Sequence, residues 1–140
     1  DERPRLVLCM GDTLVHLTDW HAVQTLIAEV VDAVLPGGSF VASLRDYTTA
    51  PPEGPKRFIP VRSSADQIFT CFLWYRDDTV DVHDILQTRD GDDWRLQVSQ
   101  YQKLRLDYRR VIKLLQELGM KVDRPFDDHG MICIRSVKPD

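Results

Sequence analysis

The sequence predicts an α/β fold with a partly parallel sheet. This prediction rests on one pattern at the start of the chain and another at its end. A short apolar run at residues 6–10 precedes an amphipathic segment that stops at Pro36-Gly37-Gly38, and a second apolar run at 39–44 follows. Strand, helix and strand in this order form a βαβ unit, whose two strands are parallel. The end of the chain then returns to a helix followed by strand-like runs.

The first strand and helix have clear local signals. Residues 6–10 are continuously apolar, which is typical of a strand covered on both faces. Thr18 or Asp19 can cap the helix that follows, and its apolar residues recur at the three-and-four spacing of one buried face. That face consists of Val23, Leu26, Ile27, Val30, Val31 and Val34.

The middle of the chain, residues 50–103, predicts an inserted antiparallel meander within a single domain of residues 1–140. It opens with a loop rich in proline and glycine, and Asp and Gly clusters mark the turns between its apolar runs. We expect its aromatic side chains to pack in a core or to cover an apolar pocket. The expected strands lie at residues 67–76, 80–88 and 94–102.

The last part of the chain predicts a helix and a terminal hairpin. Asp107 can cap the helix, and Gly119 is placed to end it as the left-handed residue after the last turn. Residues 120–126 and 131–137 are then expected to be two strands joined by a turn. The buried stripe of the helix consists of Tyr108, Val111, Leu114, Leu115 and Leu118.

Composition excludes several classes of protein. A net charge of −4 argues against a general nucleic-acid binder, and no apolar run approaches the length of a membrane span. The N-terminal residues do not resemble a signal peptide, so we expect a cytoplasmic protein. The sequence predicts no metal site. Three widely spaced cysteines in apolar runs are expected to be buried, reduced thiols: Cys9, Cys71 and Cys133.

Polar residues follow both strands of the βαβ unit. Asp12, Thr13 and His16 follow the first strand, whereas Arg45 and Tyr47 follow the second. Ligands of open α/β sheets bind where strands end at their carboxyl edge, so these side chains are candidates for a site. Each also has an ordinary structural interpretation: a turn or cap for Asp12 and Thr13, a plain hydrogen bond for His16, a salt bridge for Arg45 and loop packing for Tyr47.

The element order resembles the second half of a class I S-adenosylmethionine-dependent methyltransferase, a Rossmann-like sheet carrying an antiparallel insertion and a terminal β-hairpin. Two motifs narrow this resemblance. Cys-Met-Gly-Asp-Thr-Leu-Val-His-Leu at 9–17 and Arg-Asp-Tyr at 45–47 are similar to the glycine and sarcosine N-methyltransferase group. In that group the fourth strand leads into a Leu-Gly-Asn-Ser-type turn with a His shortly after, and the fifth strand ends in Arg-Asn-Tyr.

The resemblance implies methyl transfer from S-adenosylmethionine to a small-molecule acceptor in a full-length parent. Asp12 replaces an Asn of the glycine-type enzymes, so a cationic or hydroxyl-bearing acceptor is favoured over glycine. The implied roles are cofactor binding for Cys9, Met10 and Gly11, acceptor binding for Thr13, Arg45 and Tyr47, and catalysis for Asp12 and His16.

The family binds its cofactor with a Gly-rich turn after its first strand, and this chain contains no Gly-x-Gly. We therefore expect a fragment that is inactive in isolation, with a first strand that exposes a sheet edge. That edge would pair with a missing N-terminal half or with another copy. The alternative is a non-catalytic, methyltransferase-like interaction or scaffold module.

Overall fold

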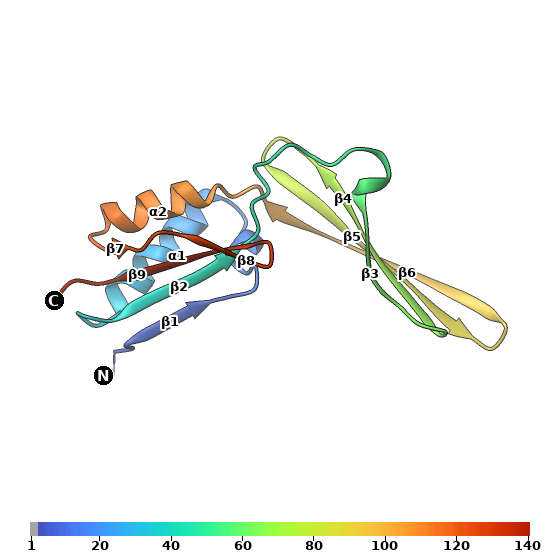
Figure 1. The fold of residues 1–140 in the computed structure, drawn as a ribbon, viewed down its shortest axis with the longest axis horizontal. Helices are drawn as coiled ribbons and strands as arrows, with labels where there is room; N and C mark the ends of the chain where they lie inside the picture. Colours follow the sequence, from blue (N-terminus) through green and yellow to red (C-terminus); the bar gives the residue numbers. More distant parts are fainter. Residues whose placement is uncertain (1–2) are drawn as a thin grey trace. The chain divides into compact units, whose positions relative to one another are not determined.

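A computed structural model of the chain describes residues 3–140, which form two compact units (Figure 1). The first unit joins the chain up to Thr48 with Leu104–Asp140, and the second unit is Thr49–Lys103. The second unit is thus inserted into the sequence of the first. It begins shortly after the second strand of the βαβ unit and ends before the last helix.

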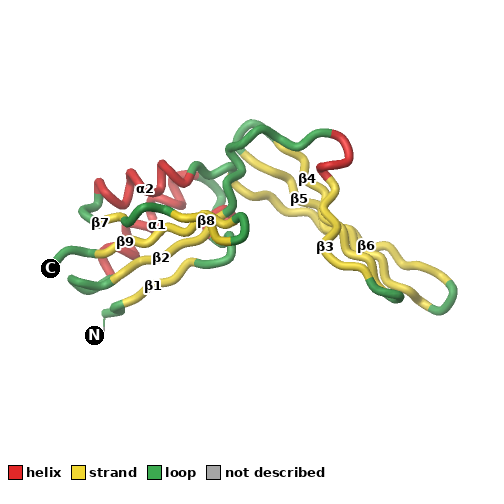
Figure 2. Tube along the Cα trace, in the orientation of Figure 1, coloured by secondary structure: helices red, strands yellow, loops and turns green. Residues whose placement is uncertain are grey.

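The first unit is a five-stranded mixed sheet with two helices (Figure 2). β1 pairs in parallel with β2, and β9 pairs antiparallel with β2, so the sheet order is β1-β2-β9-β7, with β8 also paired to β9. This order confirms the predicted βαβ unit. The elements are β1 (Leu6–Cys9), the 3-10 helix η1 (Leu14–His16), α1 (Trp20–Ala33), β2 (Ser39–Leu44), α2 (Tyr108–Glu117), β7 (Lys121–Val122), β8 (Phe126–Asp128) and β9 (Met131–Val137).

The two helices begin where their capping residues predict. Asp19 accepts a hydrogen bond from the backbone of Ala22 at 2.8 Å, and Asp107 accepts one from the backbone of Arg109 at 2.9 Å. Leu118 was expected in the buried stripe of α2 but is exposed, because α2 ends at Glu117 and Leu118 is its C-cap. The core of the first unit includes Val23, Ile27, Val31, Val34, Phe40, Ala42, Leu44, Val111, Leu115 and Ile134.

The prediction that β1 is covered on both faces is wrong. β1 is the edge strand of its sheet, and the alternate side chains of Leu6 and Leu8 are 54% and 58% exposed. Its other side chains, Val7 and Cys9, are half-buried. The continuous apolar run therefore has one free edge and one open face.

The terminal hairpin also differs from the prediction of one strand at residues 120–126. Two short strands, β7 and β8, both pair with β9: Val122 opposes Ser136 and Phe126 opposes Cys133. Four steps along the chain from Val122 to Phe126 oppose three steps along β9, so one residue is extra. Pro125 lies in this interruption and has no N–H to donate to a ladder.

The second unit is a four-stranded antiparallel sheet in the order β3-β4-β5-β6, which confirms the predicted meander. The sequence did not predict β3, because Pro60 interrupts its apolar pattern. The structure accommodates Pro60 on an edge strand, next to an irregularity in register before Arg62. The elements are the 3-10 helix η2 (Gly54–Arg57), β3 (Phe58–Ser63), β4 (Gln67–Tyr75), β5 (Thr79–Asp90) and β6 (Asp93–Leu104).

Three further findings concern residues 3–140 only. No helix in this range combines the length and the apolar character that crossing a membrane requires. Within the same range, His, Cys, Asp and Glu side chains do not gather in groups of three or more that would suit a metal ion. The three cysteines are free; Cys133 is buried as expected, whereas Cys9 and Cys71 are only half-buried.

Candidate functional site

The chain leaves β1 through two consecutive residues in the left-handed region. Gly11 has φ 73° and Asp12 has φ 68°, a conformation that Asp and Asn tolerate better than most residues. The backbone N–H of Gly11 donates to the hydroxyl of Ser43 at 2.8 Å, and that of Asp12 donates to the Ser43 carbonyl at 3.0 Å. The turn after β1 is therefore fastened to the end of β2.

The carboxylate of Asp12 extends this link across the two strand ends. It is 3% exposed; its Oδ1 accepts from the backbone N–H of Arg45 at 2.8 Å, and its Oδ2 accepts from the hydroxyl of Tyr47 at 3.0 Å. The Tyr47 side chain is itself buried. Both oxygens of Asp12 thus hold the segment after β2, which is a positioning role; its predicted catalytic role stays a prediction.

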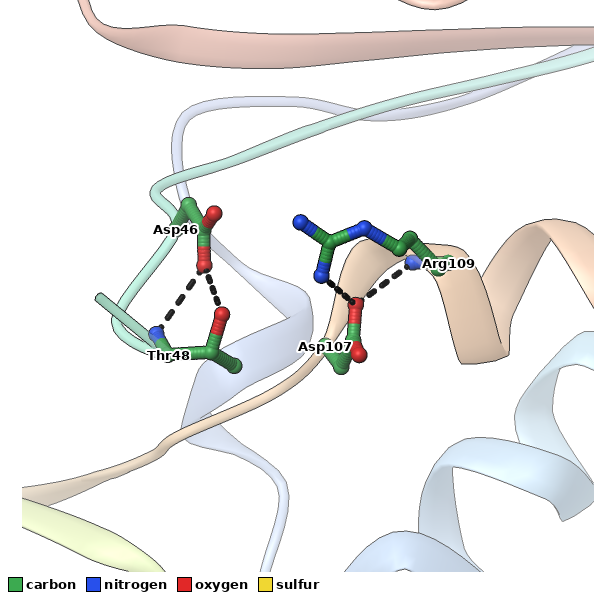
Figure 3. A network of polar contacts seen from close by, with 4 residues as sticks. All are labelled: Asp46, Thr48, Asp107 and Arg109. Atoms are coloured by element: carbon green, nitrogen blue, oxygen red, sulfur yellow. Dashed lines mark hydrogen bonds and ion pairs between the residues drawn. The ribbon is translucent and has the colours of Figure 1, made fainter.

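The segment after Tyr47 is held by polar contacts of its own (Figure 3). Arg105 donates from Nε to the Tyr47 carbonyl at 2.9 Å. The Asp46 carboxylate accepts from the backbone and the hydroxyl of Thr48, at 2.9 and 2.5 Å. These bonds give the loop after β2 one defined course.

The same view contains the start of α2, where Asp107 accepts from both the backbone and the guanidinium of Arg109. The pKa of Arg109 is raised, first by the neighbouring Tyr108 and then by the carboxylates of Asp107 and Asp46. The guanidinium of Arg109 therefore lies near acidic groups from two segments, the start of α2 and the loop after β2.

His16 and Thr13 are held by the turn and by η1. The hydroxyl of Thr13 donates to the carbonyl of Met10 at 2.6 Å and closes the turn. Leu14 and Val15 are completely buried, whereas His16, the last residue of η1, is exposed. The buried pair anchors a single turn of helix that presents an imidazole to solvent.

The three residues expected to contact a cofactor line the same turn. Met10 and Gly11 are exposed, and a Cβ added to Gly11 would meet no atom within 4 Å. A ligand can thus approach the backbone closely at Gly11. Burial raises the pKa of the Cys9 thiol, which keeps it protonated and unsuited to act as a nucleophile at neutral pH.

The backbone N–H of Arg45 donates a hydrogen bond to Asp12, whereas the side chain of Arg45 is exposed. A Cβ added to Gly130 would lie 3.5 Å from a terminal nitrogen of Arg45. The guanidinium therefore lies beside the turn between β8 and β9, at the same end of the sheet as the Asp12 turn.

The structure brings Asp12, Tyr47 and the backbone of Arg45 into direct contact, and it adds two residues that the sequence did not single out. Ser43 is buried and receives both N–H groups of the turn, and Arg105 fixes the loop after β2. Strand-end reasoning could have selected Ser43, because a serine near the carboxyl end of an apolar run lies where site residues are expected. Arg105 carries no such signal, because its partner lies 58 positions away.

No protein-family model and no curated protein matches this chain. Solved structures do. An S-adenosylmethionine-dependent methyltransferase from Clostridium acetobutylicum is 13% identical, with a TM-score of 0.75 over 97% of this chain and 58% of that one. The CcbJ methyltransferase from Streptomyces caelestis is 14% identical, with a TM-score of 0.80 over 100% of this chain and 59% of that one.

A third similar structure is CalS10, an amino pentose methyltransferase from Micromonospora echinaspora solved with S-adenosylmethionine bound. It is 12% identical, with a TM-score of 0.74 over 96% of this chain and 58% of that one. The chain thus has the class I methyltransferase fold over almost all of its residues, as predicted. It spans less than two thirds of the length of these structures.

Proposed function

We propose that the polypeptide containing this chain transfers a methyl group from S-adenosylmethionine to a small-molecule acceptor. The observation that carries this proposal is the left-handed turn at Gly11 and Asp12, fastened to the end of β2 in a chain with a methyltransferase fold. The carboxyl ends of two parallel strands are the usual place for a ligand in such sheets. The narrower similarity to glycine and sarcosine N-methyltransferases rests on residues 9–17 and 45–47 and stays a prediction.

The cofactor side of the site is assigned to Cys9, Met10 and Gly11. Open space at Gly11 allows the backbone to approach the amino-acid end of S-adenosylmethionine. The cofactor supplies a methyl group on a sulfonium, which is already a good leaving group. The protein's contribution is then to align the acceptor with that methyl and to exclude water.

The acceptor side is assigned to Thr13, His16, Arg45 and Tyr47, with Asp12 as the positioning residue that holds the two strand ends together. The exposed imidazole of His16 can take the proton that an amine or hydroxyl acceptor loses. The guanidinium of Arg45 can hold an acceptor carboxylate or hydroxyl. CalS10 acts on an amino pentose, and an acceptor with a basic nitrogen is the class that we favour here.

We further infer that β1 pairs with a strand from an N-terminal half of the same parent protein. β1 has a free edge, and Leu6, Leu8 and Met10 are all exposed on it or just after it. Exposed apolar edges invite strand addition, and covering them removes an aggregation hazard. The non-catalytic scaffold module uses the same edge to bind a partner strand, so the edge alone does not separate the two functions.

The test is calorimetric titration with S-adenosylmethionine and S-adenosylhomocysteine, followed by an assay of methyl transfer to amino sugars and small amines. Both use the polypeptide of the natural reading frame, with the 140-residue chain titrated in parallel. Both compounds are expected to bind the natural polypeptide. A folded natural polypeptide that binds neither compound overturns the enzyme proposal and leaves the scaffold module.

Site variants separate the assigned roles. His16→Ala is expected to lower kcat by roughly a hundredfold, the usual contribution of a general base. Arg45→Ala is expected to raise the KM of the acceptor and leave cofactor affinity unchanged. The matched controls are His129→Ala, an exposed imidazole in the turn before β9, and Arg95→Ala in the second unit. Turnover that is unchanged in both His16→Ala and Arg45→Ala refutes the site assignment.

A further inference from the structure

The sheet of the second unit has a pocket on one of its faces. Phe69 opposes Leu86 across β4 and β5. Two positions further along β4, Cys71 opposes Asp84. Directly opposed side chains share a face, and so do side chains two positions apart on one strand, so these four lie together. The pocket on this face has a volume of about 430 Å³ and is lined by Phe69, Asp84, Leu86, Gln97, Val98 and Ser99.

β6 supplies two polar side chains to the pocket. Asp81 lies on the other face of β5, three positions before the carboxylate of the pocket, and it accepts a hydrogen bond from the side chain of Gln102 at 2.7 Å. Gln102 therefore lies on that other face, and alternation along β6 turns Gln97 and Ser99 toward the pocket. Both are exposed, and their amide and hydroxyl groups can each donate and accept hydrogen bonds.

Among the described residues that line the pocket, only Asp84 carries a charge. Asp84 is half-buried, and its Oδ1 accepts a hydrogen bond from Sγ of Cys71 at 3.0 Å. A thiol is a weak donor, whereas a carboxylate has about four lone-pair positions on its two oxygens. The contact with Cys71 therefore leaves Asp84 able to accept stronger hydrogen bonds from a ligand.

The other charged side chains that these strands place on this face lie outside the pocket lining. By opposition and alternation they are Arg62, Asp90, Asp93, Arg95 and Lys103. Arg62 donates to the side chain of Gln67 at 2.7 Å, and Arg95 forms an ion pair with Asp90, next to the turn between β5 and β6. These two guanidinium groups are thus held by partners of their own.

The thiol of Cys71 shows which charge dominates beside the pocket. Its pKa is raised to about 11, first by burial and then by the hydrogen bond and the charge of Asp84. The ammonium of Lys103 lowers this pKa and is the smallest of these influences; it lies 6.0 Å from the ring centroid of Tyr101. At this position the negative charge of Asp84 therefore outweighs the positive charge of Lys103, which favours a cationic ligand.

The walls beside Asp84 select the kind of cation. Phe69 and Leu86 are half-buried and present an aromatic ring and an aliphatic side chain. A metal ion requires several ligating side chains, and His, Cys, Asp and Glu do not gather in groups of three or more within residues 3–140. An acidic partner would bring a like charge toward Asp84. A cation with an apolar body matches both the carboxylate and the walls.

We propose that this pocket binds an organic ammonium ion with an apolar body. The ammonium group donates to Asp84, and the apolar body packs against Phe69 and Leu86. Gln97 and Ser99 bind polar substituents of the same ligand at the exposed side of the pocket. This inference rests on the second unit alone and is independent of the proposed methyl transfer and of the β1 edge.

The test is titration of the isotope-labelled 140-residue chain with 2-phenylethylamine, followed by nuclear magnetic resonance of the backbone amides. At neutral pH this probe is an ammonium ion on a short linker to a phenyl ring. We expect saturable shifts at the amides of β4, β5 and β6 around Asp84, Gln97 and Ser99. A wild-type chain that shows no saturable shift there overturns the proposal.

Three other compounds test the charge and the apolar body on the wild-type chain. 2-Phenylethanol carries a neutral hydroxyl in place of the ammonium group, and phenylacetate carries a carboxylate. Each should bind roughly tenfold more weakly or less, because neither donates a charged hydrogen bond to Asp84. Glucosamine has the ammonium group on a hydroxylated ring and should also bind more weakly. Binding of 2-phenylethanol or glucosamine as tight as that of 2-phenylethylamine overturns the proposal.

Variants then assign the binding to individual side chains. Asp84→Asn should weaken the binding of 2-phenylethylamine roughly tenfold or more, since the amide keeps the size of the side chain and loses its charge. Asp92→Asn removes the same charge from the exposed turn between β5 and β6 and is the matched control. Leu86→Ala should weaken binding as well, whereas Ile85→Ala, on the other face of β5, should not.

The amide spectrum of each variant shows directly whether it is folded, and the comparison of compounds on the wild-type chain does not depend on any variant. If Asp84→Asn and Asp92→Asn weaken binding equally, the attraction is a general effect of negative charge and the proposal is wrong. Shifts that map to the face of Asp81 instead of the face of Asp84 also contradict it.

Discussion

Replacing Asp12 tests whether its carboxylate holds the ends of β1 and β2 together. Asp12→Ala removes the acceptor of two short hydrogen bonds, from the Arg45 backbone at 2.8 Å and the Tyr47 hydroxyl at 3.0 Å. A hydrogen bond to a charged group contributes about 1.5–3 kcal/mol, and alanine at φ 68° adds about 1 kcal/mol of strain. We therefore expect Asp12→Ala to lower the free energy of unfolding by about 4 kcal/mol.

Two other replacements at this position divide that cost into its parts. Asparagine tolerates the left-handed backbone, its amide oxygen can accept from Arg45, and its amide nitrogen can donate to the Tyr47 hydroxyl. Asp12→Asn should therefore cost only about 1 kcal/mol. Asp12→Gly relieves the backbone strain and still loses both hydrogen bonds, so its stability should lie between those of Asn and Ala.

Urea unfolding followed by far-ultraviolet circular dichroism measures these differences. For a chain of this length, the alanine variant should also melt roughly 10–15 °C lower than the wild type. Asp78→Ala, in the exposed turn between β4 and β5, is the control and should change stability by less than about 0.5 kcal/mol. Equal stability of the Ala and Asn variants would refute the reasoning. A loss of turnover in Asp12→Asn without a loss of stability would instead support its predicted catalytic role.

Two further predictions concern Cys71 and Gly38. Burial, together with the hydrogen bond to Asp84 and the charge of Asp84, raises the pKa of the Cys71 thiol from 9.0 to about 11. Alkylation of Cys71, followed by peptide mapping, should therefore accelerate only near pH 11. In Asp84→Asn the pH at which alkylation reaches half its maximal rate should be lower. The pKa of this thiol is higher in the folded chain than in the unfolded chain. Its contribution to stability should therefore fall as the pH rises from about 9 to about 11, which thermal melts at each pH will measure. Gly38→Ala should cost roughly 2 kcal/mol, since its Cβ would lie 2.9 Å from two backbone carbonyl oxygens. Gly91→Ala, with nothing within 4 Å, should cost only about 1 kcal/mol in backbone strain; the reverse order in urea would contradict the packing argument.

The sheet of the first unit could be predicted because its signals are local. The spacing of apolar residues in α1 and the stop at Pro36-Gly37-Gly38 are contained in the segment that they describe. The meander was predictable for the same reason, since each turn carries its own Asp or Gly. β3 was not, because the cost of Pro60 depends on whether its strand lies at an edge, which is a tertiary property.

The site could be predicted only as a set of positions. Strand-end reasoning selected Asp12, Arg45 and Tyr47 and placed them at one edge of the sheet. It could not show that the Asp12 carboxylate accepts hydrogen bonds from residues 33 and 35 positions away, which make it a buried link between the two strand ends. Long-range pairing of side chains depends on register and turn geometry, and composition carries little of that information.

The hydrogen bond from Arg105 to the Tyr47 carbonyl has a consequence for how this chain can be altered. It joins the residues on either side of Thr49–Lys103, the 55-residue segment that leaves the first unit and returns to it. Closing the gap with a few glycines would therefore cost the remaining sheet little entropy. We therefore expect that Thr49–Lys103 can be deleted, or replaced by the corresponding segment of a protein with the same fold, while β1, β2 and β9 keep their pairing.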